Sequence, residues 1–134
     1  MTNANFKRTV LFVAAAASFL SPFMISTVNI ALPAIGQYFR ADAATLGWVA
    51  TSYMLATATA LVPVGKAADV AGRRKVFALG AAIMALFNFL VLFSINLPFL
   101  IICRVFQGIG GAMIVTTSVA ILASVFPPGE RGSA

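Results

Sequence analysis

The sequence predicts an all-α integral membrane protein with four transmembrane helices. Its 134 residues are 61% hydrophobic and only 9% charged, whereas soluble domains are about 25% charged. The mean hydropathy is +1.02. The charged residues bound four long uncharged stretches, 9–39, 43–65, 76–103 and 105–129. Each is long enough for the ~20 residues that an α-helix needs to cross a bilayer, so lipid is expected to cover the outer surface.

The predicted spans are, in chain order, 10–32, 46–64, 76–95 and 99–126. Lys7 and Arg8 before the first span resemble the start of a signal peptide, but the apolar run exceeds the ~7–15 residues of a signal-peptide core. We therefore expect an uncleaved helix.

A β-barrel is the other fold that can cross a membrane. The third span reads VFALGAAIMALFNFLVLF and lacks the apolar–polar alternation of barrel strands. Helices are therefore expected in all four spans.

The distribution of lysine and arginine predicts the orientation. Cations occur in the N-terminal tail, in the loop expected at 65–75 and in the C-terminal tail, whereas the loop expected at 96–98 has none. The loop expected at 33–45 has Arg40, offset by Asp42. Because basic loops stay in the cytosol, we expect a multi-pass plasma membrane protein with both termini cytoplasmic.

Arg104 is an unusual residue for the fourth predicted span. A cation within a bilayer costs at least ~2.5 kcal/mol unless it is solvated or paired. One reading is that Arg104 extends its side chain to the nearer membrane surface. The other is that it faces an aqueous cavity, where it holds an anionic group or adjusts a proton site. Gln107 is expected to face that cavity or a neighbouring helix.

Three small residues follow Arg104 on the same helical face, and we expect them to pack against another helix: Gly108, Gly111 and Ala112. Two polar residues in the first two spans are candidates for the transport path or for hydrogen bonds between helices. These are Asn29 and Ser52.

In the segment GKAADVAGRRK, 65–75, membrane orientation explains the cations but not the spacing of the two glycines and the aspartate. Gly65 is expected to end the second helix and Gly72 to turn the chain into the third, since glycine adopts turn conformations at little cost. Asp69 lies among four cations and is expected to be ionised and paired.

This segment resembles the signature loop of the major facilitator superfamily, G-x-L-A-D-x-x-G-R-R/K, with Ala67 in place of the usual leucine. STVNIALPAIG (26–36), WVATSYMLATA (48–58) and RVFQGIGGAMI (104–114) resemble the first, second and fourth helices of its fourteen-span drug/proton antiporter branch. FPPGERGSA (126–134) resembles the loop before a fifth helix.

The resemblance implies a partial N-terminal bundle of a major facilitator fold and an exporter of drugs or amphipathic metabolites. It also implies a conformational gate formed by Gly65, Asp69, Gly72, Arg73 and Arg74. The family has twelve or fourteen spans, so we expect the remaining helices of a full transporter as partners. We do not expect this piece to transport alone.

One departure from the branch concerns proton coupling. Met24 occupies the position where the branch usually has a carboxylate. All three acids of the chain, Asp42, Asp69 and Glu130, are expected outside the membrane. These four spans therefore offer no embedded carboxylate that could carry a proton.

Other functions are disfavoured by the composition. The net charge is +6, but the cations are not interleaved with stacking aromatics as in a nucleic-acid site. Histidine is absent and Cys103 is the single cysteine, so neither an enzyme nor a cofactor site is expected. Two alternatives to a transporter fragment remain: a small dimeric multidrug exporter, which would need an intramembrane glutamate, and a non-transporting assembly or regulatory partner.

Overall fold

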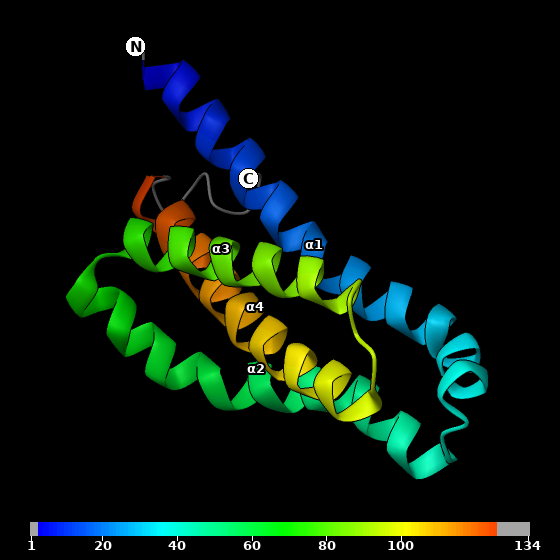
Figure 1. The fold of residues 1–134 in the computed structure, drawn as a ribbon. Helices are drawn as coiled ribbons and strands as arrows, with labels where there is room; N and C mark the ends of the chain where they lie inside the picture. Colours follow the sequence, from blue (N-terminus) through cyan, green and yellow to red (C-terminus); the bar gives the residue numbers. More distant parts are fainter. Residues whose placement is uncertain (1–2, 126–134) are drawn as a thin grey trace.

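The computed structural model describes residues 3–125 and confirms the predicted fold class (Figure 1). Four helices are long and apolar enough to cross a membrane. They are α1 (Asn3–Phe39), α2 (Ala43–Ala71), α3 (Arg73–Val91) and α4 (Leu97–Val125). Many large apolar side chains are exposed, Phe12 and Ile30 among them. A bilayer accounts for this exposure, because it supplies an apolar solvent.

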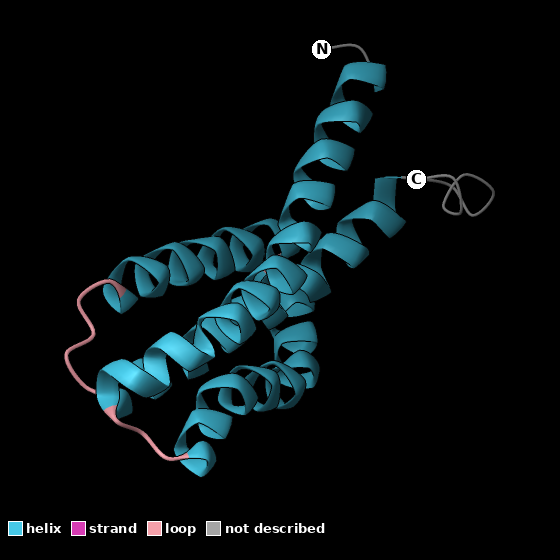
Figure 2. Ribbon diagram, turned by 90° about the vertical axis from the view of Figure 1, so that its right-hand side faces the viewer, coloured by secondary structure: helices cyan, strands magenta, loops and turns pink. Residues whose placement is uncertain are grey.

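α4 lies at the centre of the bundle and makes most of the contacts with the other helices. Figure 2 shows this arrangement from the side. Within the most apolar 18-residue stretch of each helix, 44% of the residues are buried in α4 but only 12% in α1. The first helix therefore leaves most of its surface to lipid or to other partners.

The core lies where α4 meets the other helices. One buried cluster contains Ala17, Tyr53, Met84 and Ile114, one residue from each helix. A second cluster contains Ala68, Val76 and Met113 and joins the end of α2 to the start of α3 and to α4.

The predicted loop at 65–75 is wrong, since the structure is helical on both sides of Gly72. α2 continues through Gly65 to Ala71, because this alanine-rich segment favours helix and buries Ala68 in the second core cluster. Gly72 alone breaks the helix, with φ of 99°, a conformation that glycine adopts readily.

The other predicted boundaries also shift. α1 continues past Pro33 to Phe39, which shortens the connection expected at 33–45 to Arg40–Asp42. α3 ends at Val91, before the expected residue 95.

Asn96 explains where α4 begins. Its side-chain oxygen accepts a hydrogen bond of 3.0 Å from the backbone N–H of Phe99, and this capping bond starts the helix at Leu97. The C-terminal segment, with Glu130, Arg131 and the predicted end of the fourth span at Phe126, lies outside the described residues.

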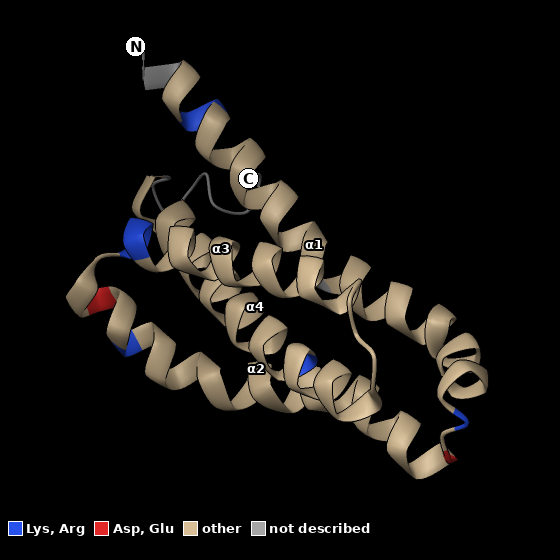
Figure 3. Cartoon of the chain, in the orientation of Figure 1, with Lys and Arg blue, Asp and Glu red and all other residues tan. Residues whose placement is uncertain are grey.

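Among residues 3–125, the charged residues gather towards the two ends of the bundle, except for one cation within α4 (Figure 3). The start of α1, the junction of α2 with α3 and the end of α4 lie at the same end. With 19 residues, α3 is about 28 Å long, close to the ~30 Å of a hydrocarbon core.

Candidate functional site

Arg104 is buried among the four helices, although it carries a full charge. It is seven positions after the start of α4, roughly 10 Å along the helix axis. Its side chain is only 3% exposed. The reading in which Arg104 reaches out to the membrane surface does not fit this position.

Polar groups of α2 and α4 bind the guanidinium of Arg104, and a side chain of α3 supports one of them. Its Nε donates a hydrogen bond to the carbonyl oxygen of Val49 at 3.3 Å, and its Nη1 donates to Oε1 of Gln107 at 2.8 Å. Nε2 of Gln107 in turn donates to Oδ1 of Asn88 at 2.9 Å. The Cζ atom of Arg104 lies 4.6 Å from the centre of the Tyr53 ring. α2 therefore contacts the cation of α4 directly, and α3 positions it through Gln107.

These contacts replace the counter-ion that a buried cation would usually need. An aromatic face and carbonyl oxygens both attract a guanidinium, but neither carries a net negative charge. Arginine has more donors than the two used here, so the guanidinium retains N–H groups that can bind an anionic or polar ligand.

A cavity of about 280 Å³ lies next to Arg104, between all four helices. Its polar lining residues are Arg104, Gln107, Asn88 and Thr27. The remaining lining is largely apolar and includes Met24, Val49 and Leu100. Among the described residues, no acidic side chain lines this cavity.

The structure does not bring Asn29 or Ser52 to this cavity. The side chain of Asn29 is exposed on α1, and within residues 3–125 it makes no hydrogen bond. Ser52 is buried and lines a different, apolar hollow together with Trp48 and Ile101.

Close glycine contacts fix α4 against α2 and α3. A Cβ atom added to Gly108 would lie 2.5 Å from the carbonyl oxygen of Tyr53 and 2.8 Å from Cβ of Ala56. Across the other interface, a Cβ on Gly110 would lie 2.9 Å from the carbonyl oxygen of Gly80. Such approaches require residues without a side chain, and they set the distance between Arg104 and its partners.

The other residues that we singled out in α4 are also buried, namely Gly111 and Ala112. A hydrogen bond of 3.0 Å from Oγ1 of Thr57 to the carbonyl oxygen of Gly108 adds to the α2–α4 contact.

A second group of predicted residues lies at the junction of α2 with α3. Nη2 of Arg73 lies 3.5 Å from Oδ1 of Asp69. Nη1 of the same arginine donates a hydrogen bond of 2.9 Å to the carbonyl oxygen of Ala120 near the end of α4. Gly65 lies within α2, where an added Cβ would be 3.6 Å from Thr116 of α4. Arg73 therefore connects three helices at one end of the bundle.

Sequence reasoning missed Val49 and Tyr53, which contact Arg104, and Asn88, which supports Gln107. Asn88 is a lone amide in an otherwise apolar run, and that was the available signal. Tyr53 is one aromatic residue in an apolar span, and the sequence does not show that its ring faces Arg104.

Comparison with known proteins places these residues in a family. Residues 14–134 match the family model described as Major Facilitator Superfamily. The chain is 34% identical over 128 residues to the riboflavin transporter RibZ of Clostridioides difficile strain 630, which covers 96% of the chain and 28% of that protein.

Two export proteins are similar to a comparable degree. The tetracenomycin C resistance and export protein of Streptomyces glaucescens is 35% identical over 80% of the chain and 20% of its own length. The cephamycin export protein CmcT of Amycolatopsis lactamdurans is 35% identical over 92% of the chain and 25% of its own length. The chain thus spans between a fifth and about a quarter of the length of these relatives.

Proposed function

This chain belongs to the major facilitator superfamily, and from that premise we propose that it takes part in the export of small molecules across a membrane. The observation that carries the proposal is the buried Arg104 beside a cavity lined by four membrane-spanning helices. Amphipathic drugs or metabolites are the proposed substrates. The proposed direction of transport, out of the cell, is based on the two relatives whose names describe export.

In the proposed mechanism, the cavity beside Arg104 is part of the transport path. Its apolar wall can accept the apolar part of a substrate, while the unused N–H groups of the guanidinium can bind a polar or anionic part. Gln107 and Asn88 position the guanidinium through the hydrogen bonds of 2.8 Å and 2.9 Å. Substrate binding would compete with the hydrogen bonds that now join Arg104 to Val49 of α2 and to Gln107.

The proposed gate is the junction of α2 with α3. Gly72 is the flexible point, and Arg73 bonds to Asp69 on one side and to the carbonyl oxygen of Ala120 on the other. An exposed ion pair contributes at most ~1 kcal/mol, so these contacts can break and re-form during a conformational cycle. Arg74, next to this junction, lies with Cζ 5.9 Å from the centre of the Phe6 ring.

The proposal places the chain in the plasma membrane, with the α2–α3 junction and the start of α1 in the cytosol. Clustered cations at this end of the bundle support that orientation. Because the relatives are several times longer, further helices are proposed to complete the transport path. The bilayer and a small-molecule substrate are the other proposed partners.

Gene deletion and complementation test the proposal. Cells that lack the gene for this chain should accumulate more riboflavin or cephamycin, the compounds in the names of two relatives, than wild-type cells. The wild-type gene should restore export, whereas Arg104→Gln should not, because a neutral amide lacks the charge and the forked donors. Arg40→Gln is the matched control, since Arg40 is exposed in the α1–α2 connection. Equal accumulation in all strains for every compound tested would refute transport.

A further inference from the structure

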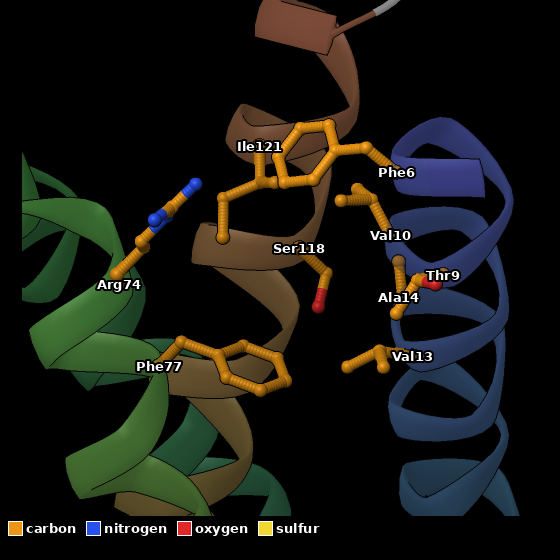
Figure 4. A pocket seen from close by; sticks show the side chains of 9 residues that line it. All are labelled: Phe6, Thr9, Val10, Val13, Ala14, Arg74, Phe77, Ser118 and Ile121. Carbon is orange, nitrogen blue, oxygen red and sulfur yellow. The ribbon is translucent and has the colours of Figure 1, made fainter. Parts of the chain in front are cut away.

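A third hollow lies at the end of the bundle where α1 and α3 begin and α4 ends. It is partly open, has a volume of about 250 Å³ and is lined mainly by apolar side chains. Figure 4 shows Phe6, Val10 and Val13 of α1 facing Phe77 of α3 and Ile121 of α4 across it. An apolar cavity of ~150 Å³ suffices to bind benzene, so this one can hold a segment of hydrocarbon chain.

The mouth of this pocket is basic. Arg74 lines it, and an adjoining hollow of about 470 Å³ is lined by Arg73, Arg74 and Lys75. The two hollows share Phe6, and no acidic residue lines either of them within the described part of the chain. Arg73 is held by Asp69 and α4.

Two other cations at the mouth are available for a ligand. Within residues 3–125, Arg74 has only the distant ring of Phe6 as a partner, and Lys75 has no side-chain bond. The exposed start of α3 adds further positive character, since the first N–H groups of a helix lack internal partners. No acidic residue occurs in its first turn, and no side chain caps it.

Ser118 gives an independent sign that a ligand belongs in the pocket. Its side chain is 1% exposed, and its hydroxyl has no hydrogen-bond partner among the described residues. Figure 4 shows this hydroxyl between Phe77 and α1, inside the pocket. Buried hydroxyls nearly always find a partner, and a ligand with an acceptor oxygen would supply one.

We propose that this pocket binds an anionic glycerophospholipid. Arg74 and Lys75 bind its phosphate at the start of α3, one acyl chain fills the apolar pocket, and an ester oxygen accepts the hydrogen bond of Ser118. The position suits a lipid, because the pocket spans the first turns of α1 and α3 and the last turns of α4, where headgroups meet hydrocarbon. Basic pockets between membrane helices are known binding sites for anionic headgroups.

Lipid competition tests this site without reference to transport. The 134-residue chain is reconstituted in nanodiscs with phosphatidylglycerol and phosphatidylcholine of identical acyl chains, extracted in mild detergent, and its bound lipids are counted by native mass spectrometry. We expect phosphatidylglycerol to be enriched. Arg74→Gln should lower the enrichment about fivefold, the effect of one cation near a lipid surface. Arg40→Gln, the same change at the other end of the bundle, should leave it unchanged.

A pocket-filling variant tests the acyl site. Ala14→Phe should remove the bound lipid with either headgroup while the helix content, measured by circular dichroism, stays that of the wild type. Ser118→Ala, which keeps the shape of the pocket, provides a second test and should lower lipid retention.

Four results would overturn the proposal. They are equal binding of the two lipids, equal loss in Arg74→Gln and Arg40→Gln, displacement of the lipid by inorganic phosphate, and a dimer mass with no bound lipid. The third would assign the site to a free anion, and the fourth would assign the pocket to a second copy of the chain.

Discussion

Replacing Gly108 with alanine should loosen the contact between α2 and α4. The added Cβ would lie 2.5 Å from the carbonyl oxygen of Tyr53, 2.8 Å from Cβ of Ala56 and 3.2 Å from the backbone nitrogen of Thr57. Two of these three neighbours are backbone atoms, so the helices themselves must move apart. Overpacking of this kind costs about 1–3 kcal/mol.

Gly47→Ala is the matched control in the same helix pair. Gly47 lies in α2, and apart from its own helical turn and chain neighbours no atom lies within 4 Å of its added Cβ. Alanine improves helix propensity by up to ~1 kcal/mol at either position, so this gain cancels when the two variants are compared. The difference between them should therefore be about 1–3 kcal/mol, a 5- to 150-fold change in the unfolding equilibrium.

Unfolding in mixed micelles of mild detergent and SDS, followed by circular dichroism and Trp48 fluorescence, measures this difference. Gly108→Ala should unfold at a lower SDS fraction than wild type, and Gly47→Ala at an equal or higher one. If both variants unfold together, the close approach of α4 to α2 does not limit stability and the reasoning fails.

Three further predictions concern the gate, the arginine network and pH. Asp69→Asn should slow export by more than half while changing stability by no more than ~1 kcal/mol, because an exposed pair contributes little to folding; unchanged export would remove Asp69 from the gate. Asn88→Leu should lower the free energy of unfolding by about 1–3 kcal/mol in the same SDS titration, since it leaves the buried amide of Gln107 without its partner. Asn29→Ala, at an exposed site, should have no effect. Equal unfolding midpoints for the two variants would refute the network. The hydroxyl of Thr45 donates a hydrogen bond to the carboxylate of Asp42 and thereby holds the pKa of Asp42 below its usual value. This contact stabilises the fold above the ordinary pKa of an aspartate and is lost as the pH falls through the lowered one; in an NMR titration Thr45→Ala should raise the pKa of Asp42, and an unchanged pKa would contradict the assignment.

The membrane fold was predictable because uncharged length is a strong signal. Four stretches long enough to cross a bilayer admit few other interpretations, and the structure has four such helices. The match to the Major Facilitator Superfamily confirms the resemblance that began with the segment 65–75.

Helix boundaries were less predictable. The segment 65–75 combines charges with glycines and therefore reads as a loop, yet its alanines continue α2 until Gly72. Whether a glycine ends a helix or lies against a neighbour depends on what packs beside it. Gly65 packs near Thr116, and Gly72 has open space around it.

The surroundings of Arg104 could be predicted only in part. An intramembrane arginine is visible in the sequence, but its partners come from other helices, and one sequence does not show which side chains meet. Gln107 lies one turn away on α4, so it was accessible to reasoning about helix periodicity. Val49, Tyr53 and Asn88 depend on how α2 and α3 pack against α4.

The central position of α4 has a consequence for biogenesis. The ribosome makes this helix after the other three, although it is the one on which they pack. At roughly 5–20 residues per second, α1 leaves the ribosome several seconds before α4 is complete. During that delay the earlier helices lack their main partner, so they must wait in the insertion machinery or in lipid, and assembly begins when α4 arrives.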